Sequence, residues 1–279
     1  MNRKVSLSAF LIISLLSLSS CGNGSSYSTP IITNVENQSI SITWDSWDGS
    51  AKEISTITRD GTYSGEMIDG IPNGLGSFSS TNSAGITWTY TGGFSDGKFN
   101  GYGKTVWEET GEIEEGTYIN GVFTPNTYEL FNTLSSRLFV PYSFSDKNAS
   151  FIQDNLDIFP ASTAESKEKA LTFINADLSY PMMTKTLEGL EGQLYQCPEA
   201  LATQVFQESL YGHAVTSLVA YDENHNYYVI LYDGELPDLY DNTLISFVGL
   251  PISYSGYDNV SGGTTTVIVL IGSSVQVES

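Results

Sequence analysis

Hydrophobic and polar positions divide the chain into three stretches with different patterns. In the C-terminal stretch, short β-branched or aromatic runs alternate with turn residues, a pattern typical of strands. These runs cover residues 189–196, 214–221, 226–232, 243–250, 264–271 and 275–278. Their number and spacing predict a small antiparallel β-barrel over residues 178–279 that closes its own edges. Another small antiparallel barrel or a β-sandwich is the alternative.

The middle stretch, residues 126–177, is predicted to be a helical connector. A helix over residues 126–138 would place four apolar side chains on one side, namely Tyr128, Phe131, Leu134 and Leu138. Ser162 and Glu165 have the spacing of a capping box, and a second helix is expected over residues 164–174. Pro160 ends the segment between the two helices.

The first stretch, residues 41–125, contains an internal repeat. Residues 63–76 (YSGEMIDGIPNGLG) and 90–103 (YTGGFSDGKFNGYG) align at a spacing of 27 residues without insertion. Their Asp-Gly and Asn-Gly dipeptides accept the positive φ of tight turns, so each copy predicts a β-hairpin. A truncated third copy follows at residues 115–121, and a degenerate leading hairpin is expected at residues 41–61 with Trp44 and Trp47.

This repeat resembles the MORN family. The positions that carry the resemblance are Tyr63, Gly65, Gly70, Gly74 and Gly76, then Tyr90, Gly92, Gly97, Gly101 and Gly103, then Gly116 and Gly121. The chain departs from the family pattern at Met67 and Phe94, where tryptophan is preferred, and at Gly93, where glutamate is usual. The resemblance implies stacked hairpins that associate with proteins or with further copies. One hairpin cannot cover its own apolar face, so neighbouring copies must stack.

The C-terminal stretch resembles OB-like domains, through diffuse features between residues 178 and 279. Such domains often bind oligonucleotides with basic grooves and stacked aromatic side chains. Here the aromatic residues Tyr227, Tyr228, Tyr232 and Tyr240 lie among Asp233, Glu235, Asp238 and Asp241. Nucleic acid is therefore excluded as the expected ligand, and these aromatic residues are expected to be mainly core, with a sugar or peptide site as the alternative.

The N-terminus has the pattern of a secretion signal over residues 1–20. A short basic segment precedes an apolar run that is too short to span a bilayer. The sequence Leu18-Ser19-Ser20-Cys21 resembles a bacterial lipobox, which implies an acylated Cys21 at the start of the mature chain and an extracytoplasmic, membrane-anchored protein. An ordinary cleaved signal with a stray cysteine is the alternative. Residues 21–40 are expected to be a flexible polar tether.

The charge of the chain restricts its partners. With 32 acidic against 11 basic residues the formal net charge is −21, which opposes binding to phosphate backbones and anionic lipid headgroups. Apart from the acyl anchor, no membrane contact is expected. After lipidation of Cys21 only Cys197 remains, so neither an internal disulfide nor a cysteine zinc site is expected.

No catalytic site is expected from the candidate residues. His213 and His225 are interpreted as ordinary structural or surface residues, and the G-x-S-x-G match at residues 93–97 lies inside a hairpin and not before a helix. Two acidic clusters, Glu108, Glu109, Glu112, Glu114 and Glu115, and Asp233, Glu235, Asp238 and Asp241, do not have the spacing of a calcium loop. We therefore expect no catalysis, no metal and no cofactor.

Two functions remain open. The first is a membrane-anchored scaffold that binds an unidentified protein, or itself, through its repeats. The second is a carbohydrate-binding or wall-remodelling enzyme that uses surface carboxylates. Because so few repeats leave an apolar face uncovered, we expect the connector to cover part of it and a protein partner to bind the remainder. The barrel is expected to fold without the repeats.

Overall fold

The computed structural model describes residues 29–138, 140–258 and 262–278. Residues 31–279 form one compact unit, and the fold below is that of its described part. The signal segment, Cys21 and residues 22–28 of the expected tether lie outside the described residues. No helix in the described part is both long and apolar enough to cross a bilayer.

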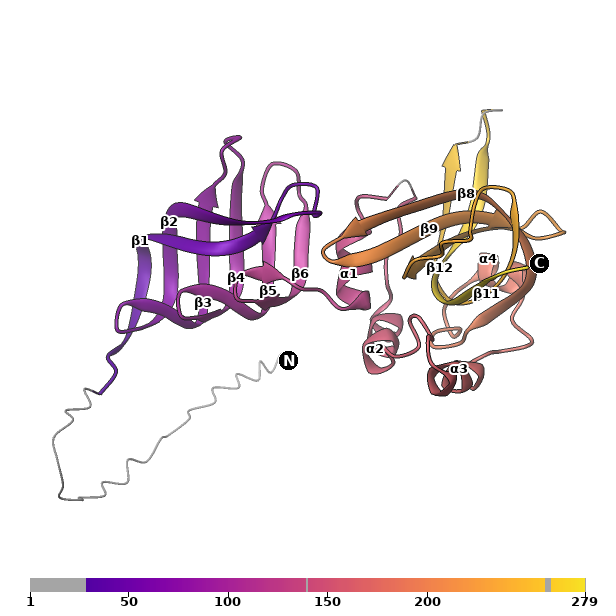
Figure 1. Ribbon diagram of the computed structural model, residues 1–279, viewed down its shortest axis with the longest axis horizontal. Coiled ribbons are helices and arrows are strands. Elements are labelled where there is room, and N and C mark those ends of the chain that lie inside the picture. Colours follow the sequence, from indigo (N-terminus) through magenta and orange to yellow (C-terminus); the bar gives the residue numbers. More distant parts are fainter. Residues whose placement is uncertain (1–28, 139, 259–261, 279) are drawn as a thin grey trace, which may run out of the picture. The chain divides into compact units, whose positions relative to one another are not determined.

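The repeats form a seven-stranded antiparallel sheet in which every strand pairs with the next along the chain (Figure 1). Its strands are β1 (Ile32–Trp47), β2 (Ile54–Ile68), β3 (Ile71–Thr81), β4 (Thr87–Ser95), β5 (Lys98–Trp107), β6 (Ile113–Ile119) and β7 (Val122–Phe123). The expected leading hairpin is β1–β2. It begins earlier than predicted: residues 32–40, expected in the tether, pair with β2 and belong to the sheet.

The predicted turns lie at the three equivalent dipeptides, Asp69-Gly70, Asp96-Gly97 and Asn120-Gly121, all with positive φ. The prediction of further hairpin turns at Gly74 and Gly101 is wrong. Gly74 and Gly101 do have positive φ, +69° and +81°, but they lie inside β3 and β5. There the pairing with the preceding strand shifts register, so these glycines form β-bulges and not hairpin turns.

A row of glycines crosses the sheet and explains the repeat. Adjacent strands pair Gly65 with Gly76, Gly76 with Gly92, Gly92 with Gly103 and Gly103 with Gly116. The tyrosine of each full copy folds over this row: a Cβ atom on Gly76 would lie 2.6 Å from the Tyr63 hydroxyl, and one on Gly103 2.4 Å from that of Tyr90. Tyr63 Oη then donates to the Glu66 carbonyl at 2.6 Å. The glycines are thus required by the buried tyrosines.

The connector contains α1 (Thr127–Leu134), α2 (Asp146–Asp154) and α3 (Ala164–Leu171). The first and third were predicted, although each is shorter. Asn126 and Glu129 form the capping box of α1. The capping box of α3 uses Thr163 and Ser166, one residue later than the predicted pair. α2, which Ser145 caps, was not predicted.

The C-terminal strands form a closed five-stranded barrel, as predicted, in the order β10-β12-β11-β8-β9. They are β8 (Tyr195–Leu210), β9 (His213–Tyr221), β10 (Tyr227–Asp233), β11 (Thr243–Asp258) and β12 (Thr264–Val277). One pairing corrects the antiparallel expectation, because β10 and β12 run parallel. A ring with an odd number of strands cannot alternate direction at every step, so at least one pairing must be parallel.

Two boundaries at the start of the barrel also differ from the prediction. A short helix, α4 (Tyr180–Lys185), occupies residues expected to begin the strands, and Pro181 stands in its first turn. The strand expected at residues 189–196 reaches β8 only at its end, because Gly189 and Gly192 have positive φ and form turns. β8 begins at Tyr195 and continues to Leu210, well beyond the predicted end of that strand at residue 196.

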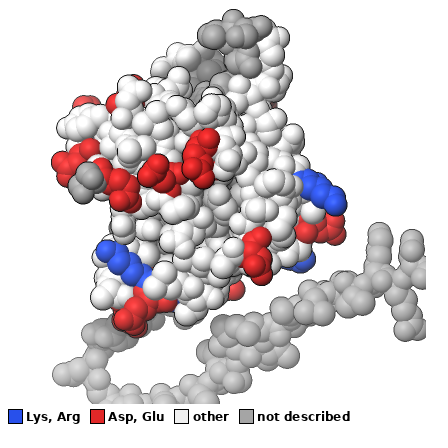
Figure 2. Space-filling view, turned by 90° about the vertical axis from the view of Figure 1, so that its right-hand side faces the viewer, with Lys and Arg blue, Asp and Glu red and all other residues white. Residues whose placement is uncertain are grey.

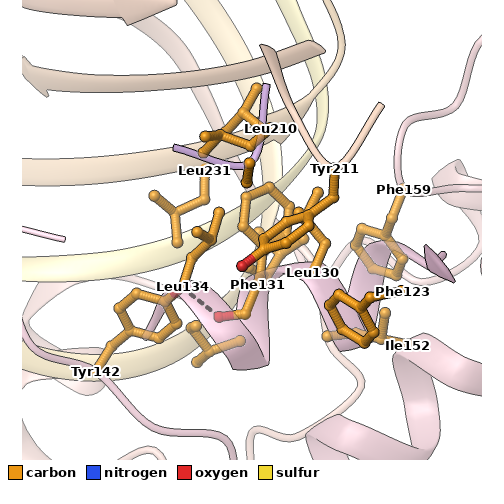
Figure 3. Packing of buried hydrophobic residues seen from close by; sticks show 14 of the residues in the cluster. Phe123, Leu130, Phe131, Leu134, Tyr142, Ile152, Phe159, Leu210, Tyr211 and Leu231 are labelled. Atoms are coloured by element: carbon orange, nitrogen blue, oxygen red, sulfur yellow. Dashed lines mark hydrogen bonds between the residues drawn. The ribbon is translucent and has the colours of Figure 1, made fainter. Parts of the chain in front are cut away.

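The sheet and the barrel share a hydrophobic core through the connector. Figure 3 shows the buried cluster where Phe123 of β7 and Tyr211 of the β8–β9 turn lie near Leu130 and Phe131 of α1. Tyr142 Oη donates to the Phe131 carbonyl at 2.6 Å in the same cluster. A second cluster, which includes Tyr228, Phe247 and Ile268, forms the interior of the barrel. Removing the sheet would therefore expose core residues of the remaining chain.

Candidate ligand pocket on the inner face of the sheet

An open pocket of about 410 Å³ lies on the inner face of the repeat sheet. Its volume is within the range of roughly 300–1,000 Å³ that is common for small-molecule sites. All four tryptophans of the chain line it, together with other aromatic and charged side chains. The lining includes Trp44, Trp47, Trp88, Trp107, Phe99, Tyr118, Phe123, Tyr211, Ile57, Ile86, Arg59, Arg137, Asp48, Glu112 and Glu114.

The pocket exists because the repeat changes along one row of the sheet. Beside the glycine row, cross-strand pairing aligns Tyr63, Phe78, Tyr90, Thr105 and Glu114 on successive strands. The first three are fully buried aromatic side chains. Thr105 is the counterpart of Phe78 in the second copy, and Glu114 is the counterpart of Tyr63 and Tyr90 in the third. These smaller or polar residues leave space that an aromatic ring occupies in the first copy.

Tyr211 enters this space from the barrel. It lies in the tight β8–β9 turn with φ of +52°, and its backbone N–H donates to the Ala51 carbonyl. Its hydroxyl donates to Glu114 Oε1 at 2.6 Å and accepts a hydrogen bond from Arg137 Nη1 at 2.8 Å. Arg137 also lies 3.8 Å from a Glu112 carboxylate oxygen. Tyr211 and Arg137 thereby connect the base of the pocket to the connector and the barrel.

The electrostatics of this group follow from its enclosure. Burial raises the pKa of the Glu114 carboxyl, while the Tyr211 hydrogen bond and the nearby Arg137 charge oppose that shift. The pKa of Tyr211 is also raised, first by burial and then by the Glu114 charge. The phenol is therefore neutral at physiological pH and acts as a hydrogen-bond donor to Glu114.

The four tryptophans differ in how firmly they are held. Trp47 Nε1 donates to the Phe123 carbonyl at 2.7 Å. Trp44 and Trp88 pack edge-to-face, with ring centroids 5.7 Å apart, and are 4% and 6% exposed. Trp107, partly exposed, pairs across strands with Trp88 but makes no aromatic ring contact with any described residue. Its indole surface is therefore the one most available to a ligand.

Three indole N–H groups at the pocket are free to donate. Within the described ranges, Trp44, Trp88 and Trp107 have no hydrogen-bond partner for Nε1, in contrast to Trp47. They are also not among the fully enclosed polar atoms without a partner, which in the described part are the hydroxyls of Thr133 and Ser273. The pocket wall thus offers donors as well as ring faces.

The structure separates the first acidic cluster predicted from the sequence. Glu114 of β6 and Glu112 of the preceding turn line the pocket, whereas Glu115 forms an ion pair with Lys104 at 2.8 Å. Glu109 accepts hydrogen bonds from the Thr87 backbone N–H. Within the described residues, no group of His, Cys, Asp and Glu side chains could hold a metal ion.

Residues of the second cluster take structural roles. Asp233 Oδ1 lies 2.9 Å from His213 Nδ1, and its Oδ2 accepts from the Thr127 hydroxyl at 2.6 Å. His213 Nε2 is 2.8 Å from the Pro125 carbonyl. Asp241 accepts from the Val205 backbone N–H. His213 thus joins the barrel to the start of the connector, a role that the sequence did not indicate.

The remaining candidates lie away from the pocket. His225 is exposed in the turn between β9 and β10. Cys197 is buried in the barrel, and burial raises the pKa of its thiol to about 11, so it is not a reactive thiolate. The G-x-S-x-G match spans the β4–β5 hairpin, without the helix that a nucleophile elbow requires. Figure 2 shows that acidic side chains outnumber basic ones on the barrel end of the molecule.

Sequence analysis identified the tryptophans only in part and did not predict a pocket. The sequence signal that could have indicated the pocket is the loss of aromatic residues between equivalent positions of successive copies. Phe78 is replaced by Thr105, and Tyr90 is replaced by Glu114. The contribution of Tyr211 had no sequence signal, because it comes from a turn that lies 97 residues after Glu114.

The fold and the pocket define a mainly β protein in which a repeat sheet and a closed barrel share one hydrophobic cluster and the barrel has a second in its interior. The family model of the MORN repeat matches residues 63–84 and 90–109. These two segments are the full copies recognised from the sequence, and the chain therefore contains MORN repeats, which are generally interaction modules. No curated protein and no solved structure matches the chain.

Proposed function

We propose that this protein is a membrane-anchored, extracytoplasmic binding protein without catalytic activity, which recognises its partner on the inner face of the MORN sheet. The observation that carries the proposal is the open aromatic pocket at the point where the repeat loses its core residues. An anchored interaction module agrees with the MORN repeats, the lipobox-like segment ending at Cys21 and the net charge of −21.

The surroundings of the pocket carboxylates favour binding over hydrolysis. A retaining or inverting glycosidase needs two carboxyl groups that are free to act on the glycosidic bond. Here Glu114 accepts the Tyr211 hydroxyl, and Glu112 faces the Arg137 guanidinium. Both carboxylates support the base of the pocket, and we therefore assign them a structural role.

The partner expected from the MORN resemblance is a protein or a second copy of the chain. The connector contacts the sheet at β6, where the backbone N–H and the hydroxyl of Thr117 donate to Glu129 of α1. This contact leaves the pocket open, and recognition of a partner is assigned to the pocket.

Site-specific photo-crosslinking in cells that produce the full chain tests this proposal. A diazirine side chain is placed at Ser83, exposed at the pocket rim, or at Thr91, exposed on the strand beyond it. Diazirines insert into C–H and O–H bonds, so protein and glycan partners are both captured. We expect an adduct from Ser83 and none from Thr91. Equal adducts at both positions, or none at Ser83, would refute recognition through this pocket.

A further inference from the structure

The chemistry of the pocket indicates which class of ligand it accepts, an inference that rests on the function proposed above. Trp107 offers an aromatic surface that no other described ring covers, beside the packed Trp44–Trp88 pair. A ligand that uses this surface needs an apolar face, and a ligand that satisfies the free indole N–H groups needs acceptor oxygens nearby. A pyranose ring has both, since its axial C–H groups form an apolar face and its hydroxyls project from the edge.

The polar lining suits hydroxyl groups. Arg59 lines the pocket, donates one hydrogen bond, to the Thr58 carbonyl, and forms no ion pair with any described residue, so its guanidinium has N–H groups left to donate. The Thr110 side chain also lines the pocket and adds a hydroxyl that can both donate and accept. Sugar hydroxyls donate and accept at once, and such a mixed set of donors and acceptors matches them.

The charges of the lining disfavour the other ligands that bind to aromatic pockets. A quaternary ammonium or lysine side chain requires carboxylates without partners, whereas each of the three in the lining has one. Asp48 accepts from the Ser50 hydroxyl and the Lys52 backbone N–H, Glu112 lies beside Arg137, and Glu114 accepts from Tyr211. An acidic ligand would have to approach a chain with a net charge of −21. The charges of the lining and the net charge of the chain together favour a neutral ligand.

We propose that this pocket binds a neutral glycan, with one pyranose ring stacked on Trp107 and its hydroxyls bonded to Arg59 and to the free indole N–H groups. The saccharide is then the group through which this site recognises its partner. A proline-rich peptide also packs on tryptophan, and it is the competing outcome of the test.

Intrinsic tryptophan fluorescence provides the readout, because all four tryptophans of the chain line the pocket. The full chain is titrated with neutral oligomers of glucose, mannose and N-acetylglucosamine, each from the disaccharide to the hexasaccharide. We expect a saturable change in emission with at least one series. Trp107→Ala should weaken binding about tenfold or more, and Arg59→Gln severalfold. Thr91→Ala, outside the pocket, should bind as the natural chain does.

Folding of each variant is checked by its thermal transition, and Trp107→Phe, which keeps a ring, should retain part of the affinity. The inference is overturned if no neutral series gives a saturable change, or if Trp107→Ala binds with unchanged affinity. A response to poly-L-proline alone would reject the saccharide but keep the pocket as a binding site. Failure of the photo-crosslink at Ser83 would reject the proposed function itself.

Discussion

His213 shows how one residue can couple the two halves of the fold to pH. Its two ring nitrogens lie beside acceptors, the Asp233 carboxylate at 2.9 Å and the Pro125 carbonyl at 2.8 Å. Only the protonated imidazole can donate to both. The hydrogen bond to Asp233 raises the pKa of His213 above its usual 6.5, burial opposes the shift, and the Asp233 charge adds to it.

This pKa shift has a defined consequence for stability. Because the folded pKa is raised, the stabilisation is fully present below about pH 6.5 and is lost as the pH rises through the folded pKa. We predict that His213→Asn lowers the free energy of unfolding by about 1–3 kcal/mol at pH 6 and by less at pH 9, in urea titrations. The exposed His225→Asn is the matched control. An equal loss at both pH values would contradict stabilisation by a protonated His213 that donates to both Asp233 and the Pro125 carbonyl.

At the scale of elements, the hairpins were predictable and the bulges were not. Asp-Gly and Asn-Gly dipeptides mark the turns because both residues accept positive φ, as at Asp69 and Gly70. The same chemistry at Asn73-Gly74 was misread as a turn, since a bulge also requires positive φ. The sequence alone does not distinguish these two uses, because the difference depends on the pairing with the preceding strand.

The barrel shows a similar limit. Most of its strands were visible as apolar runs, such as residues 227–232, but β8 continues through residues 201–210, whose exposed polar positions hid it. The parallel β10–β12 pair follows from closing five strands into a ring, a property that no single strand carries. Similarly, the pocket is lined by residues of the repeat sheet and also by Tyr211 of the barrel and Arg137 of the connector. Only the lining that comes from the repeats could have been predicted from the sequence.

The bulges give a direct test of the repeat geometry. Gly101 has a φ of +81°, and a Cβ atom there would meet nothing within 4 Å. Gly101→Ala should therefore destabilise the protein by about 1 kcal/mol through backbone strain alone, measured by urea titration. Gly49 also has open space around it but ordinary φ, so Gly49→Ala should change stability little. Equal effects at both positions would show that the bulge assignment is wrong.

At the scale of the whole molecule, the shared core changes the expectation that the barrel folds without the repeats. Phe123, Leu130 and Tyr211 are buried in one cluster that spans both halves. We predict a single cooperative unfolding transition. Tryptophan emission reports only on the sheet, and far-ultraviolet circular dichroism reports on the entire fold, so their midpoints in urea should coincide. A circular dichroism transition that persists after the emission change is complete would indicate an independent barrel.

The location of the molecule is tested separately from its fold. We predict that Cys21→Ala moves the protein from the membrane fraction to the soluble fraction, because a single acyl-bearing cysteine is its only expected anchor. Detergent phase partitioning measures the change, with Cys197→Ala as the control, since that thiol is buried in the barrel. If the Cys21 variant partitions as the natural chain does, the anchor is elsewhere.

The central claim is that recognition occurs in the space left where Thr105 replaces the aromatic residue found at Phe78 in the first copy. Thr105→Phe restores that residue in the pocket wall, at the cost of the hydrogen bond between the Thr105 and Tyr118 hydroxyls, and is designed to narrow the pocket from within the sheet. The decisive measurement is the yield of the Ser83 photo-crosslink in this background, with circular dichroism to confirm the fold. We predict that the adduct is lost while the fold is kept. An adduct of unchanged yield in the folded Thr105→Phe variant would contradict the account.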